Sequence, residues 1–328
     1  LPGKTVTTEF ACGESGPTLN PHDPDRTPGG SSSGTAASVG GGLMPAGLAT
    51  QTRASTIRPA SYCGAYGFKP THGSLTLAGV HPVSASLDHL GVIAASVEDG
   101  WLIARHIAEF AGGEAGRPPL DGPLAPPEAV QPARIGVIYS SGWSQVDEES
   151  ANAFMQVEER LADAGVTIIS ANADGHIARF EEAIHEADPL SVDLMAIELE
   201  WPMAAYQEAG GKLGPTISKY VENAKAITNQ GYRDRLERRD VMVAEMERLR
   251  PEVDVLISLS ASGPAPKGLG YTGSRSMIAP WTLLGTPAWS LPVMVSDGMP
   301  LGLQVIGFRG DDARLTGICR WITQKLLS

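Results

Sequence analysis

Serine residues in a glycine-rich stretch, residues 29–70, are the first candidates for chemistry in this sequence. Ser31, Ser32 and Ser33 follow two glycines, and Ser55 stands 24 positions after Ser31. Glycine allows sharp turns and close backbone approach, and the N–H groups of such turns can point together at an anion or a polarised carbonyl oxygen. A serine in this setting is a candidate nucleophile for acyl transfer.

A flexible Gly/Ser linker is the alternative explanation for the first of these segments, GGSSSG. The residues that follow argue against a linker, because residues 36–39 are small and helix-compatible and Leu43-Met44 is a short apolar run. We therefore predict a helix from Ser33 or Thr35 to about Gly42. The free N–H groups of its first turn would lie beside the serines.

A serine hydroxyl also needs a base within hydrogen-bond reach and N–H donors for the developing oxyanion. No histidine lies in the serine-bearing loops, and the nearest one, His72, leaves a Ser-His-Asp arrangement open. The chain has no Gly-x-Ser-x-Gly nucleophile elbow. We interpret His22-Asp23 as a turn between two prolines, and Asp88-His89 as a structural hydrogen-bonding pair.

The motifs of this stretch resemble those of the amidase signature family, which has a GGSS-type loop, a nucleophile loop, a proline, a cysteine-glycine pair and a Gly-(Phe/Leu)-Lys-Pro-Thr run. The two serine-bearing loops correspond to GGSSSG at residues 29–34 and ATQTRAS at residues 49–55. Further matching segments are Pro59, Cys63-Gly64 and residues 67–71, 8–11, 20–24, 285–288 and 302–304. The resemblance covers nearly the whole chain, and the helical middle part matches only loosely.

This resemblance implies a Ser-Ser-Lys triad, in which a neutral lysine accepts a proton relayed through a bridging serine held by a cis peptide bond. Ser55 corresponds to the nucleophile and Ser31 to the bridging serine. The backbone N–H groups of Thr52, Arg53, Ala54 and Ser55 correspond to the oxyanion hole. The implied reaction is amide hydrolysis through an acyl-enzyme.

The lysine of that triad has no counterpart in this sequence. In the family it lies farther upstream of the nucleophile than the residues before Ser55 allow, and Lys4, Lys69 and Lys267 do not match its position. We therefore expect the lysine on a segment that precedes Leu1.

The nucleophile loop also departs from the family pattern, because Ala49, Arg53 and Ala54 stand where glycines are expected. Arg53 matters most, since a long side chain replaces hydrogen where the backbone must face the substrate. It could narrow the site, favour substrates with an anionic or polar group, or project to solvent. A positive φ at Arg53 would add strain of roughly 1–2 kcal/mol.

Strands and helices alternate along the rest of the chain. The predicted strands are residues 5–8, 133–138, 166–169, 253–257 and 303–307, and the predicted helices are residues 96–110, 148–164, 180–206, 217–250 and 311–327. This order predicts a layered α/β/α fold around a large mixed, mostly parallel sheet, which is also the amidase signature fold. We expect residues 1–328 to form a single domain that lacks its N-terminal segment.

Composition narrows the partners and the compartment. A net charge of −12 disfavours binding to nucleic acids or anionic membranes. Cys12, Cys63 and Cys319 are odd in number and lack metal-ligand spacing, which indicates neither a disulfide framework nor a zinc site and fits a reducing cytoplasm. No transmembrane run or signal peptide is recognisable. We expect no cofactor, no metal, no nucleic acid and no membrane partner, and a homodimer stays open.

The function expected from the sequence is that of a serine amidohydrolase acting on the amide, carbamate or ester bond of a small molecule. Two alternatives stay open. One is a glutaminase-type subunit of a tRNA-dependent amidotransferase, which would need partner chains. The other is a noncatalytic amidase-like binding protein, favoured by the missing lysine and by Arg53. The aromatic residues considered as apolar walls of the substrate cleft, or else as core, are Trp143, Trp201, Tyr206 and Trp281.

Overall fold

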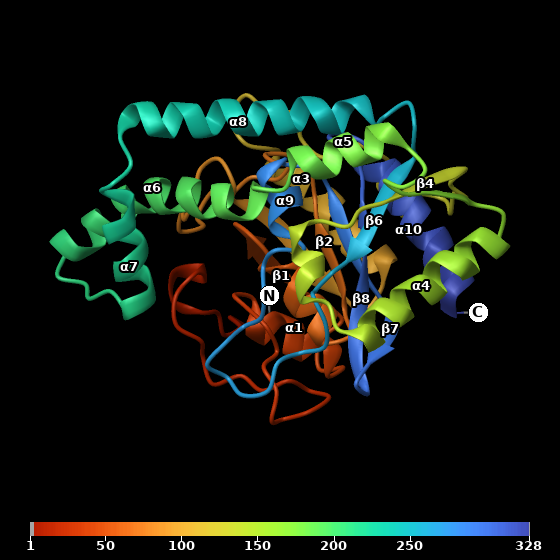
Figure 1. The fold of residues 1–328 in the computed structure, drawn as a ribbon. Coiled ribbons are helices and arrows are strands. Elements are labelled where there is room, and N and C mark those ends of the chain that lie inside the picture. Colours follow the sequence, from red (N-terminus) through yellow and green to blue (C-terminus); the bar gives the residue numbers. More distant parts are fainter. Residues whose placement is uncertain (1–2, 328) are drawn as a thin grey trace.

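An eight-stranded mixed sheet runs through the computed structural model, which describes residues 3–327 of the chain (Figure 1). The strand order is β1-β3-β2-β7-β8-β6-β4-β5. The strands are β1 (Ala46–Gln51), β2 (Tyr66–Lys69), β3 (His89–Ala94), β4 (Arg134–Val137), β5 (Thr167–Ile169), β6 (Val255–Leu259), β7 (Ala288–Ser296) and β8 (Met299–Ile306).

Helices cover this sheet and extend beyond it. The α-helices are α1 (Ser33–Gly40), α2 (Ile57–Tyr62), α3 (Val97–Ala111), α4 (Glu148–Asp163), α5 (Gly175–Ala183), α6 (Ala187–Glu208), α7 (Pro215–Ala224), α8 (Asn229–Arg248), α9 (Ala279–Leu283) and α10 (Asp312–Leu327). Two short 3₁₀ helices are η1 (Glu9–Ala11) and η2 (Ser141–Gln145). Within residues 3–327, no helix combines the length and apolar character that crossing a membrane requires.

The predicted layered α/β fold with a large mixed sheet is confirmed, but the expectation that the sheet is mostly parallel is wrong. Only β4 pairs in parallel, with β5 and with β6, and the other pairings among the described strands are antiparallel. The β4-α4-β5 unit gives the parallel pair expected of a β-α-β order. In contrast, β7 and β8 are joined by a two-residue turn at Asp297-Gly298, where both φ angles are positive, as in the tight turns of antiparallel hairpins.

The predicted helix beside the serines is confirmed as α1, whereas the strand predicted over residues 5–8 does not form. That segment instead runs along the first serine loop, where Thr8 N–H donates to the Ser31 carbonyl at 3.1 Å and Gly34 N–H to the Val6 carbonyl at 2.9 Å. Each of the two long helices predicted in the middle of the chain is divided in two, as α5 and α6 and as α7 and α8.

Large aromatic side chains fill the core next to the serine loops. Phe68 of β2 and Trp289 of β7 are cross-strand partners, and their rings stack with centroids 4.3 Å apart. Trp101 of α3 lies against the same Phe68 ring, and Trp281 of α9 is fully buried. This packing fixes β2, which pairs with β3, and β3 pairs in turn with β1, the strand that ends at the Ser55 loop.

The helices α6 and α7 reach away from the sheet, and α8 runs back over the body beside α5 (Figure 1). The helix α6 packs on α7 and α8, and it also contacts α9 of the body. We call residues 187–248 the helical arm. It matters for the site because the side chains of Asp188 and Ser191 on α6 contact Arg53 in the Ser55 loop.

Candidate active site

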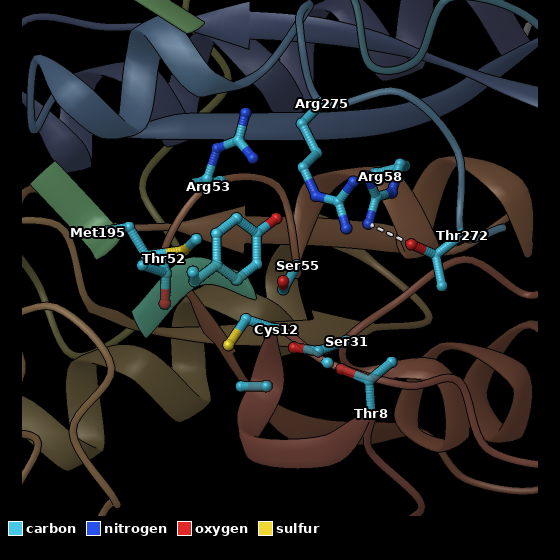
Figure 2. A pocket seen from close by; sticks show the side chains of 13 residues that line it. Thr8, Cys12, Ser31, Thr52, Arg53, Ser55, Arg58, Met195, Thr272 and Arg275 are labelled. Atoms are coloured by element: carbon cyan, nitrogen blue, oxygen red, sulfur yellow. Dashed lines mark hydrogen bonds between the residues drawn. The ribbon is translucent and has the colours of Figure 1, made fainter. Parts of the chain in front are cut away.

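Ser31 and Ser55 line the same solvent-open pocket (Figure 2). Ser31 precedes α1, and Ser55 lies in the loop that joins β1 to α2. The two loops touch directly, because the Ser32 N–H donates to the Ser55 carbonyl at 3.4 Å. The residues that line the pocket are Thr8, Ala11, Cys12, Gly13, Ser31, Thr52, Arg53, Ser55, Arg58, Met195, Tyr220, Thr272 and Arg275.

Local sequence explains why the first serine loop takes this path. Gly29 has φ +80°, and a Cβ there would lie 2.9 Å from the backbone of Pro59. Both the positive φ and the lack of space require glycine at this position. The peptide bond between Gly30 and Ser31 is cis. Arg58 of α2 then holds this loop, because its guanidinium donates to the Gly30 carbonyl at 2.6 Å and to the Gly273 carbonyl at 2.7 Å.

Four consecutive backbone N–H groups of the second loop are free. Those of Thr52, Arg53, Ala54 and Ser55 donate to no atom of the residues that the structure describes. None of these residues has a positive φ, so the side chains that replace the family's glycines are accommodated without backbone strain. Free N–H groups beside a serine are what an oxyanion hole requires.

Two side chains that the sequence analysis did not single out, those of Gln51 and Thr282, hold this loop in its conformation. Gln51 accepts the N–H groups of Thr56 and Ile57 with its Oε1, at 2.9 and 3.0 Å. Its Nε2 donates to Thr282 Oγ1, and the Thr282 hydroxyl donates to the Arg53 carbonyl at 2.8 Å. The Arg53 carbonyl is thereby held on the α9 side of the loop.

Asp88 anchors the same loop from β3. Its Oδ1 accepts from the Thr52 hydroxyl at 2.6 Å, and its Oδ2 accepts the N–H groups of Val83 and Ser84. Burial raises the pKa of this carboxyl, while the hydrogen bonds from Thr52 and the backbone oppose the rise. Asp88 is thus structural, but the predicted Asp88-His89 pair is wrong, because His89 bonds to the Leu87 carbonyl and Asp88 to Thr52, Val83 and Ser84.

The Arg53 side chain neither projects to solvent nor strains its loop. Its Nε donates to Ser191 Oγ at 3.0 Å, and its guanidinium forms an ion pair with Asp188, both on α6 of the helical arm. Desolvation lowers the pKa of this buried guanidinium, and Asp188 counteracts that effect. Arg53 therefore ties the nucleophile loop to the arm.

The hydroxyl of Ser31 is buried and has no hydrogen-bond partner among residues 3–327. The pocket lining includes no Lys, His, Asp or Glu, so none of the described residues supplies a base to the two serines. Lys4 bonds to the neighbouring Thr5 carbonyl and Lys267 is exposed. Lys69 donates to the Thr286 and Pro70 carbonyls instead, and desolvation lowers its pKa to about 7.

The histidines also lie elsewhere. His72 packs edge-on against His89, with ring centroids 5.0 Å apart, outside the residues that line the pocket. The structure therefore gives no support to a Ser-His-Asp arrangement on His72. His22 bonds to the Cys63 carbonyl, and Asp23 pairs with Arg26, which agrees with a structural turn.

None of the four aromatic residues considered as cleft walls lines the pocket. Trp281 belongs to the core, Trp143 packs on Phe154, Trp201 is 76% exposed, and Tyr206 packs on Phe10. The arm contributes Met195 and Tyr220 instead. Only tertiary packing brings these two residues to the serines, so no local pattern could have identified them. Across residues 3–327, no cluster of His, Cys, Asp and Glu is suited to hold a metal ion.

Comparison with known proteins agrees with this arrangement. The profile of the family described as Amidase matches residues 2–316. A glutamyl-tRNA(Gln) amidotransferase subunit from Cenarchaeum symbiosum is 29% identical over 363 residues, which span 96% of this chain and 72% of the relative. A solved amidase superposes with a TM-score of 0.83 at 28% identity, over 99% of this chain and 74% of the other. A glutamyl-tRNA(Gln) amidotransferase subunit from Thermotoga maritima superposes with a TM-score of 0.79 at 25% identity, over 98% and 72%.

Proposed function

Because this chain belongs to the amidase signature family, whose members hydrolyse C–N bonds, we propose that it is a serine amidohydrolase that cleaves the amide bond of a small molecule. The acyl-enzyme forms on Ser55. The observation that carries this proposal is the meeting of Ser31 and Ser55 in one pocket, with Ser55 in a loop that has four consecutive free backbone N–H groups.

Each group has a role in the proposed reaction. The Ser55 Oγ attacks the carbonyl carbon of the amide, and its proton passes to the Ser31 hydroxyl while Ser31 gives its own proton to a base. The N–H groups of residues 52–55 stabilise the oxyanion. The C–N bond then breaks as the amine leaves with a proton returned along the same path, and water hydrolyses the ester on Ser55 by the reverse relay.

The base of this relay is proposed to be a neutral lysine outside the residues described. The unsatisfied Ser31 hydroxyl supports it, because a buried hydroxyl without a partner costs free energy unless another group satisfies it. In the family that the sequence resembles, this role belongs to a lysine farther from the nucleophile than the residues before Ser55 reach. Carbamates and esters present the same polarised carbonyl to Ser55 and are proposed as further substrates.

A second candidate function is that of a glutaminase-type subunit of a tRNA-dependent amidotransferase. The names of the curated relatives favour it, because they are subunits of glutamyl-tRNA(Gln) amidotransferases. The chemistry on Ser55 would be the same, with glutamine as the amide. The two candidates differ in whether hydrolysis requires partner chains.

Labelling of the full-length protein with a fluorophosphonate tests the shared chemistry. We expect the label on Ser55, mapped by peptide mass spectrometry, and no label after Ser55→Ala. Replacing an exposed serine, Ser144→Ala, is the control and should leave labelling unchanged. An unlabelled wild-type protein, or a label on another serine, would contradict the assignment and favour a noncatalytic role.

Ammonia release separates the two candidate functions. The full-length protein is incubated alone with glutamine and with a panel of simple amides. Hydrolysis of simple amides without added partners supports the small-molecule amidase. Hydrolysis of glutamine only, and only with partner chains present, would support the amidotransferase function instead.

A further inference from the structure

Positive charge is concentrated in the pocket although the chain as a whole is acidic. Three arginines, Arg53, Arg58 and Arg275, are among the residues that line it, and no lining residue carries a carboxylate. The net charge of the chain is −12, so the composition alone would not place cations here. A cleft lined by charges of one sign raises the local concentration of ligands of the other sign.

Two of the three arginines are occupied by protein groups. Arg53 is paired with Asp188 and bonded to Ser191. Arg58 donates to the carbonyl oxygens of Gly30 and Gly273, and desolvation lowers its pKa to about 9. These side chains hold loops in place and have few donors left for a ligand.

Arg275 differs, because its guanidinium makes no hydrogen bond or ion pair with any residue between 3 and 327. It is partly exposed, and Figure 2 shows it extending toward Ser55 beside Arg58. Its backbone is fixed, since its carbonyl accepts the N–H groups of Ile278 and Ala279 at the start of α9. A fixed backbone presents a free guanidinium to the pocket.

The surroundings of Arg275 favour an anion over water alone. Its charge is one of the causes that lower the pKa of both Arg53 and Arg58, which shows that the three cations repel one another. An anion bound at Arg275 would relieve this repulsion. A guanidinium also matches a carboxylate in geometry, because it can donate two parallel N–H bonds to the two oxygens.

We propose that Arg275 is a specificity-determining residue that binds a carboxylate of the substrate, so that the preferred substrates are small amides carrying a carboxylate a few bonds from the scissile C–N bond. This inference rests on the proposed amidase function. It also assigns distinct tasks to the arginines: Arg53 and Arg58 shape the pocket, and Arg275 selects the substrate.

The first test compares succinamate with butyramide, two amides of similar length that end in a carboxylate and in a methyl group. With the full-length enzyme, we expect kcat/KM for succinamate to exceed that for butyramide by at least about tenfold, as one charge-assisted contact provides. Arg275→Gln should abolish this preference, mainly by raising KM for succinamate. Arg275→Lys should restore part of it, and Arg233→Gln on the exposed face of α8 should change nothing.

The second test does not depend on catalysis. Binding of succinamate and butyramide is measured by calorimetry on the Ser55→Ala protein, with and without Arg275→Gln. Tighter binding of succinamate that disappears with Arg275→Gln supports the inference even if no amide is hydrolysed, in which case the proposed function fails and the anion site stands. Equal affinity for both compounds, or a preference that survives Arg275→Gln, would overturn it.

Discussion

The serine loops and the helical arm meet at one pocket but are held in different ways. The loops are almost wholly buried and are fixed by hydrogen bonds to Arg58, Gln51, Thr282 and Asp88. The arm is less buried. Nine residues of α6 are buried, but only Ile217 and Ala224 of α7 and Met242, Glu245 and Met246 of α8 are.

Polar contacts at several places join the arm to the body. Arg53 pairs with Asp188, and the Gly214 N–H donates to Glu9 Oε1 at 2.9 Å. Glu198 accepts hydrogen bonds from Ser84 and Ser86, and Glu14 accepts them from Thr216. Phe10 also packs edge-on against Tyr206, with ring centroids 4.8 Å apart. The comparison indicates that the two regions have different tasks. The loops hold the reacting groups, and the arm supplies pocket-lining residues that can differ without moving those groups.

The sharpest test of this division is the loss of the nucleophile. Ser55→Ala should lower kcat by about 10³ to 10⁶, the range found when one member of a catalytic unit is removed. Combining it with Ser31→Ala should cost no more, because the two serines act together. The measurement is single-turnover kinetics on the full-length enzyme. A double variant much slower than Ser55→Ala would show that the serines act independently.

Acid should destabilise the body and not the arm. Burial lowers the pKa of His72 to about 4, with Lys69, Arg117, Arg309 and Arg239 adding to the shift. The folded pKa lies below the unfolded value of 6.5, so the unfolded chain binds more protons between pH 6.5 and 4. The stability that His72 contributes is therefore complete above pH 6.5 and is lost as the pH falls toward 4.

The expected loss from His72 is about 2–3 kcal/mol between pH 6.5 and 4, since one unit of pKa is worth 1.36 kcal/mol and the group is partly solvated. Urea denaturation at several pH values measures it. His72→Gln should flatten the profile, and the exposed His176→Gln of α5 should not. His89 also has a strongly lowered pKa because of burial, so part of the slope should survive in His72→Gln. If the pH dependence of the free energy of unfolding were the same in His72→Gln as in the wild type, groups other than His72 would cause the loss of stability in acid.

Arg53 joins the two regions, so its replacement tests whether the arm matters for the reaction. Arg53→Gly should change kcat/KM by at least about tenfold, equivalent to some 1.4 kcal/mol, because it frees Asp188 and Ser191 and loosens the arm wall. Asp188→Asn should act in the same direction, and the double variant should show non-additive effects. Identical kcat/KM values over neutral and acidic amides and carbamates would separate the arm from the chemistry.

The same contrast explains how much could be predicted from the sequence. The serine loops could be located because glycine, serine and proline encode turns directly, and the N-cap Ser96, which accepts the Asp99 N–H at 3.0 Å, marked the start of α3. Strands β1, β2, β3 and β7 were missed. β1 is rich in small residues, β2 has four residues, and β3 is a short apolar run without alternation. β7 contains Pro292 and a register shift between Leu291 and Met294.

The wall of the pocket could not be predicted for a different reason. Met195, Tyr220 and Arg275 reach the serines only through the packing of α6, α7 and α9, and nothing in their local sequence distinguishes them from other surface or core residues. Gln51 was missed too, although its side chain bonds to Thr56, Ile57 and Thr282. Its bond to Thr282 spans 231 residues, and such a contact leaves no periodic pattern in the sequence.

The smallest expected effect comes from the surface of the arm. Arg238 of α8 pairs with Glu186 just before α6, and both side chains are more than half exposed. Water and salt screen such a pair, so Arg238→Ala should change the free energy of unfolding by no more than about 0.5 kcal/mol and kcat/KM by less than about twofold. Urea denaturation and steady-state kinetics, each beside Arg53→Gly, measure the two effects. If Arg238→Ala lowered the free energy of unfolding by more than roughly 1.5 kcal/mol, exposed ion pairs would be important for the stability of the arm. The Arg53 contact would then not be the main interaction that holds it.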